Sequence, residues 1–231
     1  HQLTKIYGEQ TAVNAISFSA EPGQVLGFLG PNGAGKSTTM KILTCFVPQT
    51  SGSARVAGYD VVDNPLDARR QVGYLPEHNP LYLDLYVRES LGFIANIHQV
   101  PNKKERIEQV IELTGLTSER SKKVGALSKG FRQRLGLAQA IIHDPKVLIL
   151  DEPTSGLDPN QVLGVRNLIR ELGKTKTVIF STHIMQEVEA VCDQVIIINK
   201  GNIVVDESLA QLTGRNAGRT LEEIFIELTN N

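Results

Sequence analysis

The stretch that most constrains the fold is residues 30–38, which read Gly-Pro-Asn-Gly-Ala-Gly-Lys-Ser-Thr. It matches the pattern GxxxxGK[ST] and follows the apolar run Val-Leu-Gly-Phe-Leu at residues 25–29. We therefore expect a buried strand, a glycine-rich loop and a helix in succession. In that context the loop N–H groups and the helix N-terminus can enclose a polyphosphate. The pattern assigns the following residues to this ligand: Gly30, Pro31, Asn32, Gly33, Ala34, Gly35, Lys36, Ser37 and Thr38.

Two side chains of this loop carry specific chemistry. Lys36 would neutralise the β- and γ-phosphates of the bound group. Ser37 would offer its hydroxyl to a Mg²⁺ bridging the same phosphates, because that hard cation prefers oxygen ligands. The alternative is a glycine-rich turn that happens to precede a helix, and the strand, glycines, Lys and Ser in register argue against it.

Composition excludes several classes of protein. With 231 residues and 41% hydrophobic content, the chain can bury a substantial core. A net charge of −1 gives no overall basic field, so we expect no nucleic-acid partner. The two cysteines, Cys45 and Cys192, lack metal-ligand or disulfide-framework spacing, which favours a reducing cytoplasm. No apolar stretch approaches the roughly 18 to 20 residues that span a bilayer.

The periodicity of the apolar residues changes along the chain. Up to about Asp60 it is strand-like, with alternation at residues 16, 18 and 20, whereas from Asp84 to about Thr117 it is helical. Ser128 is a plausible N-cap for the helix that follows it. We expect one domain over residues 1–231: a β part and phosphate-loop core (1–79), a helical lobe (80–135), the rest of the core (136–206) and a C-terminal helix region (207–231).

The second half of the chain predicts a parallel sheet. Uninterrupted apolar runs at 147–150 and 178–180 flank a helical pattern, as in βαβ units whose strands are covered on both faces. Lys200-Gly201 separates two further apolar runs and indicates a hairpin at the sheet edge. The predicted fold class is α/β: a P-loop NTPase (RecA-like) with a mostly parallel sheet, an antiparallel N-terminal β part and an inserted α-helical lobe.

Three further side chains follow predicted strands, at the edge of the sheet where α/β proteins place ligands. Asp151 ends the run at 147–150, and Glu152 follows it. Asp151 can hold Mg²⁺ beside Ser37, and Glu152 can accept a proton from an attacking water. His183 follows residues 178–182 and can contact the γ-phosphate and the water together. Helix capping by the two acids and a purely structural histidine are the alternatives.

These motifs together resemble the ATP-binding subunits of ABC transporters across essentially the whole chain. Residues 30–37 are similar to the Walker A loop, 147–152 to the Walker B strand with its catalytic glutamate, and 127–131 (Leu-Ser-Lys-Gly-Phe) to the signature loop. Residues 155–158 resemble the D-loop, and 181–183 the switch-histidine segment. The resemblance implies that Tyr7 stacks on adenine, that Val13 belongs to the same nucleotide site, and that Ser128 and Gly130 grip the γ-phosphate.

Two positions depart from the family pattern. Glu77 stands where the family has the Q-loop glutamine. Its carboxylate can ligate Mg²⁺ but cannot donate a hydrogen bond to water as an amide can. In the signature loop, Lys129 and Phe131 replace the third and fifth residues of Leu-Ser-Gly-Gly-Gln, while Ser128 and Gly130 are retained.

The resemblance implies a cytoplasmic ATPase, peripheral on the inner face of the cell membrane. It would bind ATP and Mg²⁺, pair with a second copy or a paralogous ATPase subunit, and drive the polytopic membrane permease subunits of an exporter. Residues 73–82 and 221–228 are more narrowly similar to the gliding-motility-associated exporter ATPases of Bacteroidota. The alternative is a soluble ABC ATPase acting as a mechanical switch on ribosomes or nucleic acid, and the single cassette favours export over it. A nucleotide-binding module without catalysis is disfavoured, because Lys36, Asp151, Glu152 and His183 are all present.

Overall fold

The computed structural model describes residues 1–216 and 218–229. Within them the central sheet has six strands in the order β10-β9-β3-β8-β7-β6, and two small antiparallel pairs, β1-β2 and β4-β5, lie beside it. The strands are β1 (Leu3–Tyr7), β2 (Gln10–Ile16), β3 (Val25–Leu29), β4 (Arg55–Val56), β5 (Tyr59–Asp60), β6 (Val72–Leu75), β7 (Val147–Asp151), β8 (Thr177–Thr182), β9 (Gln194–Asn199) and β10 (Asn202–Ser208). The helices are α1 (Lys36–Leu43), α2 (Pro65–Arg70), α3 (Val87–Ile97), α4 (Lys103–Leu113), the 3-10 turn Val124–Ala126, α5 (Lys129–Ile141), α6 (Pro159–Gly173), α7 (Met185–Val191), α8 (Leu209–Arg215) and α9 (Leu221–Thr229).

Every neighbouring pair in the sheet is parallel except β9-β10, which forms the edge hairpin. The predicted fold class is therefore confirmed. The hairpin turns at Lys200 and Gly201, which have φ values of 47° and 81°, as a two-residue type I′ turn requires. The carboxyl ends of β3, β7 and β8 lie at the same edge, so the residues that follow these strands are brought together.

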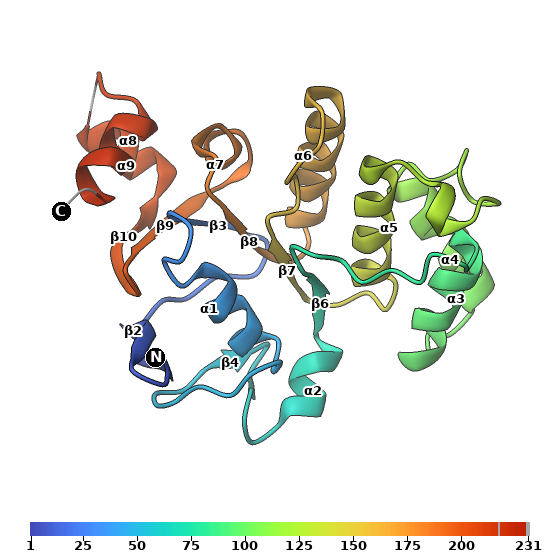
Figure 1. The fold of residues 1–231 in the computed structure, drawn as a ribbon, viewed down its shortest axis with the longest axis horizontal. Coiled ribbons are helices and arrows are strands. Elements are labelled where there is room, and N and C mark those ends of the chain that lie inside the picture. The colour runs from blue at the N-terminus through green and yellow to red at the C-terminus, as the bar shows by residue number, and fades with distance from the viewer. Residues whose placement is uncertain (217, 230–231) are drawn as a thin grey trace.

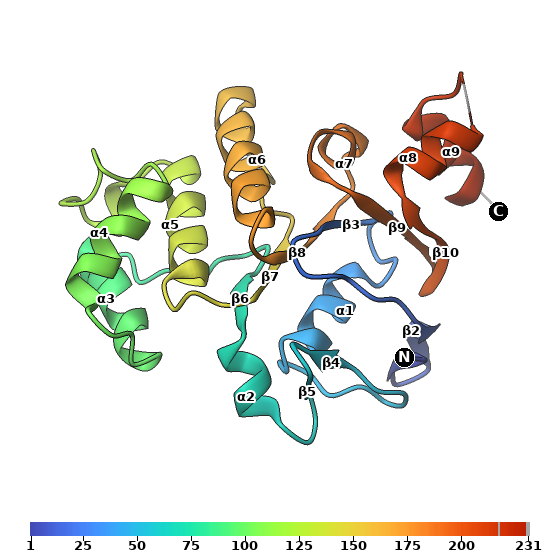
Figure 2. The ribbon, with the colours of Figure 1, turned by 180° about the vertical axis from the view of Figure 1, so that it is seen from behind.

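Alternate side chains of the buried strands pack on opposite faces of the sheet. Leu26 and Phe28 of β3 and Ile149 of β7 pack with α1 and the β1-β2 pair. Leu148 and Leu150 of β7 pack instead with α5, α6 and the helical lobe. Figures 1 and 2 show this arrangement, with α1 on one side of the sheet, α6 and α7 on the other, α3 and α4 at one end and α8 and α9 at the other.

Several sequence expectations are confirmed element by element, and others are wrong. The helical lobe is formed by α3 and α4, and Ser128 caps α5 by accepting a hydrogen bond from the Phe131 N–H. The strand-like alternation at residues 16, 18 and 20 was misleading, because β2 ends at Ile16 and its continuation is irregular. The C-terminal region contains a second helix, α8, before α9, which the sequence expectations do not include.

In the described part of the chain, no helix has both the length and the hydropathy needed to cross a membrane.

Candidate functional site

The glycine-rich loop opens α1 as predicted. Gly35, which caps the helix, has φ 111°, and a Cβ built on it would lie 2.5 Å from the Ala12 carbonyl oxygen. A side chain there would therefore meet both backbone strain and a steric clash. The loop is tied to the edge hairpin, because the Gly201 N–H donates to the Ala34 carbonyl at 2.9 Å. The loop is thus held between β2 and the β9-β10 turn.

A cavity of about 460 Å³ lies against this loop. It gathers side chains from the N-terminal pair, the loop, the segment after β6 and the ends of β7 and β8. Its lining residues are Tyr7, Gln10, Ala12, Asn32, Gly33, Gly35, Lys36, Ser37, Thr38, Glu77, Glu152, Ser155 and His183. Most of the predicted site residues, from Tyr7 near the N-terminus to His183 after β8, therefore meet in one place.

Lys36 is buried at the floor of the cavity. Its Nζ donates to the Gly30 carbonyl at 2.7 Å and the Pro31 carbonyl at 3.2 Å, and lies 3.8 Å from a Glu152 carboxylate oxygen. Burial lowers the pKa of Lys36, and the carboxylates of Glu152, Asp151 and Glu77 oppose that shift. The loop thus presents a cation whose Coulomb interactions are strengthened by its surroundings.

The side-chain oxygens of Ser37 and Asp151 lie within hydrogen-bond distance of each other. The Ser37 hydroxyl donates to Asp151 Oδ1 at 3.1 Å, and the Ser181 hydroxyl donates to the same oxygen. Within the described residues no group of three or more His, Cys, Asp or Glu side chains is placed to hold a metal ion. A hydroxyl and a carboxylate beside a phosphate-binding loop nevertheless fit Mg²⁺, which takes few protein ligands and completes its shell with water and phosphate oxygens.

Glu152 and His183 are in direct contact at the wall of the cavity. His183 Nδ1 lies 3.0 Å from both carboxylate oxygens of Glu152. Burial raises the pKa of Glu152, and the contact with His183 and the charge of Lys36 partly offset this rise. Glu152 has φ 50°, a left-handed conformation that is costly for a residue with a side chain. Its N–H is held at 3.2 Å from both the carbonyl and the hydroxyl of Ser181.

The comparisons with known proteins agree with this geometry. The family described as "ABC transporter" matches residues 13–155. The chain belongs to the ABC transporter family. It is an ATPase of that family.

Relatives of this ABC ATPase include transport and resistance proteins. It is 40% identical over 216 residues to the bacitracin transport ATP-binding protein BcrA of Bacillus licheniformis, covering 93% of this chain and 70% of that protein. It is 35% identical over 231 residues to the linearmycin resistance ATP-binding protein LnrL of Bacillus subtilis (strain 168), covering 99% and 74%. It is 36% identical over 231 residues to a Nod factor export ATP-binding protein I of Burkholderia pseudomallei (strain 1710b), covering 97% and 75%.

Solved structures share its fold. One, described as the structure of an ATP binding subunit of an ABC transporter, superposes with a TM-score of 0.89 at 28% identity, covering 98% of this chain and 97% of that one. Another, described as the dimeric structure of the bacterial ABC transporter cassette MJ0796, has a TM-score of 0.82 at 23% identity, covering 90% and 97%. The second likeness concerns the fold alone.

Some predicted residues of the ABC ATPase do not line the cavity. Val13 is fully buried in the core behind the loop, and Asp151 is also buried. Gly30, Pro31 and Ala34 contribute backbone rather than lining surface. Tyr7 does line the cavity; the residue is 46% exposed, and the Lys5 Nζ lies 5.0 Å from the centroid of its ring.

Ser128 and Gly130 of the signature loop also lie outside the cavity. Ser128 is exposed at the start of α5, whereas Gly130 is buried against α6, where a Cβ would lie 2.4 Å from the Gln161 amide carbon. The Lys129 side chain lies over Gly156 of the D-loop. The departure at Lys129 therefore places a cation over the D-loop of the same chain.

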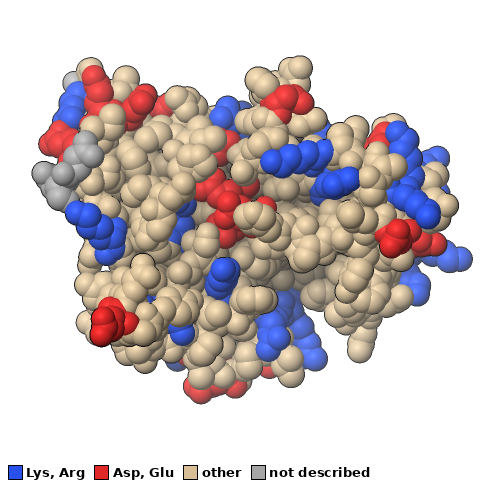
Figure 3. Space-filling view, in the orientation of Figure 1, with Lys and Arg blue, Asp and Glu red and all other residues tan. Residues whose placement is uncertain are grey.

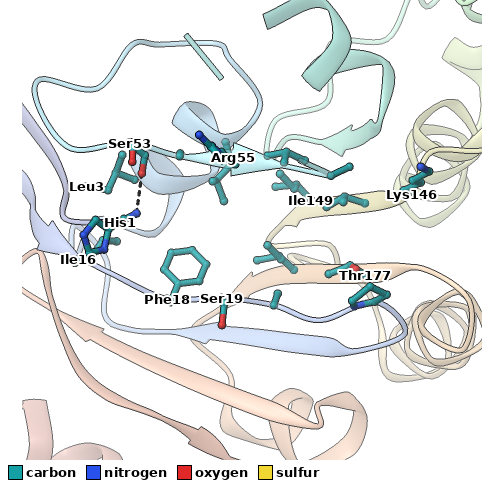
Figure 4. Close-up of a pocket in the computed structure, with 18 of the residues that line it drawn as sticks. His1, Leu3, Ile16, Phe18, Ser19, Ser53, Arg55, Lys146, Ile149 and Thr177 are labelled. Atoms are coloured by element: carbon teal, nitrogen blue, oxygen red, sulfur yellow. Dashed lines mark hydrogen bonds between the residues drawn. The ribbon is translucent and has the colours of Figure 1, made fainter. Parts of the chain in front are cut away.

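A larger cavity of about 710 Å³ lies elsewhere in the ABC ATPase. Figure 4 shows it between the N-terminal β part, with Phe18 and Arg55, and the start of β7 and β8, with Lys146 and Thr177. It contains none of the predicted site residues, and it lies at the end of these strands opposite to Asp151 and Thr182. The phosphate-loop cavity is therefore the candidate functional site.

Proposed function

We propose that this ATPase powers a membrane exporter from the cytoplasmic face of the membrane. It would act as a peripheral subunit beside separate polytopic permease chains. The observation that carries the proposal is the meeting of Lys36, Ser37, Glu152 and His183 at one cavity, while Ser128 is exposed outside that cavity. The groups proposed for hydrolysis lie together within one chain. The signature loop, residues 127–131, lies apart from them and would contact the nucleotide bound by a second, facing chain.

We assign a role to each group at the cavity. The loop amides and Lys36 would bind the β- and γ-phosphates, with Tyr7 stacked on the adenine. Ser37, Asp151 and Glu77 would hold Mg²⁺, which when bound neutralises phosphate charge. Glu152 would take the proton of the attacking water, and His183 would hold the Glu152 carboxylate while reaching the γ-phosphate. The exposed Glu77 carboxylate would contribute an oxygen ligand to the metal, but it would not donate a hydrogen bond to the attacking water.

A second copy, or a paralogous ATPase subunit, would complete each site. The N-terminus of α5, with the Ser128 hydroxyl, offers N–H groups and a positive dipole end to a γ-phosphate held by the facing chain. ATP bound between the two chains would then stabilise the dimer, and hydrolysis of ATP would allow the chains to separate. One relative of known structure, the MJ0796 cassette, is described as dimeric.

The helical lobe offers a surface for the membrane subunit. Tyr82 is 62% exposed just past Glu77, and its ring packs edge-on against that of Phe93 at 5.8 Å. Leu83 and Tyr86 are also exposed nearby. Exposed aromatic and aliphatic side chains of this kind mark interaction surfaces. The relatives named for bacitracin transport and Nod factor export support transport, and the narrower likeness to gliding-motility exporters stays a prediction.

Charge distribution favours this function over action on nucleic acid. In Figure 3 lysine and arginine side chains are scattered over the visible face, with acidic side chains among them and no continuous basic stripe. With a net charge of −1, this gives little support to the ribosome or nucleic-acid alternative. Co-purification from the native cells discriminates the two: detergent-dependent recovery of a polytopic partner supports transport, and recovery of ribosomal RNA contradicts it.

Sedimentation of a hydrolysis-deficient form tests the pairing. The Glu152→Gln protein should dimerise when ATP is added. Adding Ser128→Asp should abolish this dimer, because the new carboxylate would face the γ-phosphate while still capping α5. Adding Ser128→Asn is the matched control, since it caps the helix without charge and should leave the dimer intact. Equal dimerisation of the Asp and Asn forms, with ATP bound in both, would contradict the proposed role of Ser128.

A further inference from the structure

Glu187 on α7 is a buried carboxylate that lies behind the catalytic cavity rather than in it. It is 1% exposed and does not line the cavity. Burying a carboxylate is costly unless its oxygens find hydrogen-bond partners. Both oxygens of Glu187 do: Oε1 accepts from the Thr154 hydroxyl, and Oε2 accepts from the Thr182 hydroxyl at 2.7 Å.

The two threonines belong to the two loops that carry the catalytic side chains. Thr154 lies two residues after Glu152, at the end of β7, and Thr182 immediately precedes His183, at the end of β8. Both threonines are buried. The Thr182 hydroxyl also accepts a hydrogen bond from the Ile184 N–H at 3.1 Å, which fixes its orientation. A single carboxylate therefore links the loop of Glu152 to the loop of His183.

A third element converges on the same carboxylate. The guanidinium of Arg166, on α6, lies 4.0 Å from Glu187 Oε1. Helix α6 follows the D-loop and packs beside α7 (Figure 1). At 4.0 Å the charge of Arg166 compensates Glu187 without a close hydrogen bond. Hydrogen bonding and charge thus place Glu187 at the junction of the two catalytic loops and α6.

We propose that Glu187 is a positioning residue for ATP hydrolysis, which sets the contact between His183 and the Glu152 carboxylate by holding Thr154 and Thr182. Nucleotide binding depends instead on the loop and α1, which Glu187 does not touch. Loss of the Glu187 hydrogen bonds should therefore slow the chemical step and leave ATP affinity unchanged. A carboxylate with only a structural role would instead affect folding, and its loss would change the turnover rate and the ATP affinity together.

The test compares Glu187→Gln with Glu189→Gln in the purified chain. Glu189 is exposed, two residues further along the same helix, so it is the matched control. Steady-state hydrolysis gives kcat and KM, a fluorescent ATP analogue gives affinity, and thermal unfolding reports the folded fraction. Glu187→Gln should lower kcat severalfold with KM and analogue affinity unchanged, whereas Glu189→Gln should match the wild type.

The split between kcat and nucleotide affinity separates positioning from bulk stability. His183 Nδ1 lies 3.0 Å from both Glu152 carboxylate oxygens, and removing the Glu187 links should loosen this contact. The chemical step should therefore slow in Glu187→Gln while the analogue affinity stays unchanged, and neither should change in Glu189→Gln. Thr182→Val and Thr154→Val each remove one hydroxyl link and should reproduce this loss of kcat even if Glu187→Gln does not fold.

The outcomes are distinct from those of the pairing proposal, because all of them are turnover rates and affinities measured at one protein concentration. An unchanged kcat in folded Glu187→Gln, Thr182→Val or Thr154→Val would overturn the inference. A loss of kcat that only follows the folded fraction would overturn it as well.

Discussion

His183 Nδ1 lies 3.0 Å from both carboxylate oxygens of Glu152, and Lys36 Nζ lies 3.8 Å from one of them. Burial raises the pKa of the Glu152 carboxyl group. This carboxylate is held between the imidazole of His183 and the buried ammonium of Lys36, beside the phosphate loop. This is the environment expected of a general base, since its basicity increases while its neighbours keep the ionised form accessible.

Glu152→Gln should reduce ATP turnover at least tenfold, because general-base catalysis contributes about 10²–10⁴. The amide preserves the volume of the side chain, so ATP binding should persist. Phosphate release under saturating ATP measures the loss, and equilibrium binding of an ATP analogue provides the control. Wild-type turnover in this variant would remove Glu152 from the mechanism.

Lys36→Ala should weaken nucleotide binding or hydrolysis by about tenfold or more, since a charge-assisted hydrogen bond contributes about 1.5–3 kcal/mol. Lys41→Ala is the control, because Lys41 lies on the same helix and does not line the cavity. Isothermal titration and steady-state kinetics report the two effects. If Lys36→Ala behaved like Lys41→Ala in both, the assignment of Lys36 to phosphate would be wrong.

Gly35→Ala should destabilise the fold and weaken ATP binding. A Cβ at Gly35 would lie 2.5 Å from the Ala12 carbonyl, in addition to the strain of φ 111°. Gly58→Ala is the comparison, because Gly58 has φ +88° but open space around it, so it should cost only the backbone strain of about 1–2 kcal/mol. Urea unfolding compares the free energies of unfolding of the two variants. An equal loss of stability in both would show that the backbone moves to remove the contact with Ala12 at no cost.

His143 should make stability depend on pH. Its ring stacks on that of His98 at 3.8 Å, and its Nε2 lies 3.0 Å from the Val72 carbonyl. Burial, with the positive charges of His98 and Lys176 opposed by Asp144, lowers the pKa of His143 to about 4. The unfolded chain, with a histidine pKa of about 6.5, binds the proton more readily. The free energy of unfolding should therefore fall as the pH drops from about 6.5 to about 4.

His143→Gln should flatten this dependence by on the order of 2 kcal/mol at the acid end. His78→Gln is the control, since His78 is exposed and remote from the stacked pair in sequence. Denaturant unfolding at several pH values measures the slope. A variant slope equal to that of the wild type would show that the stacked pair is not the group responsible.

Sequence reasoning found the parts of the site that are encoded locally. The loop, the acid pair after β7 and His183 follow strand ends, so the parallel sheet brings them together. Helix α8 was missed although Ser208 and Gln211 form a capping box, a signal present in the sequence. Helix α2, which begins at Pro65 after Asn64, carried a similar signal.

Other features depend on packing between distant segments and leave no local pattern. Gln10 and Ala12 reach the cavity only because β2 lies against the phosphate loop. The left-handed backbone of Glu152 depends on its contact with Ser181. The stack of His98 on His143 and the link between Thr154 and Glu187 join segments that are far apart along the chain.

The most direct test of the account is the rate of ATP hydrolysis per chain, measured over a wide dilution series at saturating ATP. Because the hydrolytic groups lie in the cavity of one chain and Ser128 lies outside it, we predict that the rate per chain falls as the protein is diluted. The fall should coincide with the loss of dimer measured by sedimentation. A constant rate per chain among molecules shown to be monomeric would contradict the account.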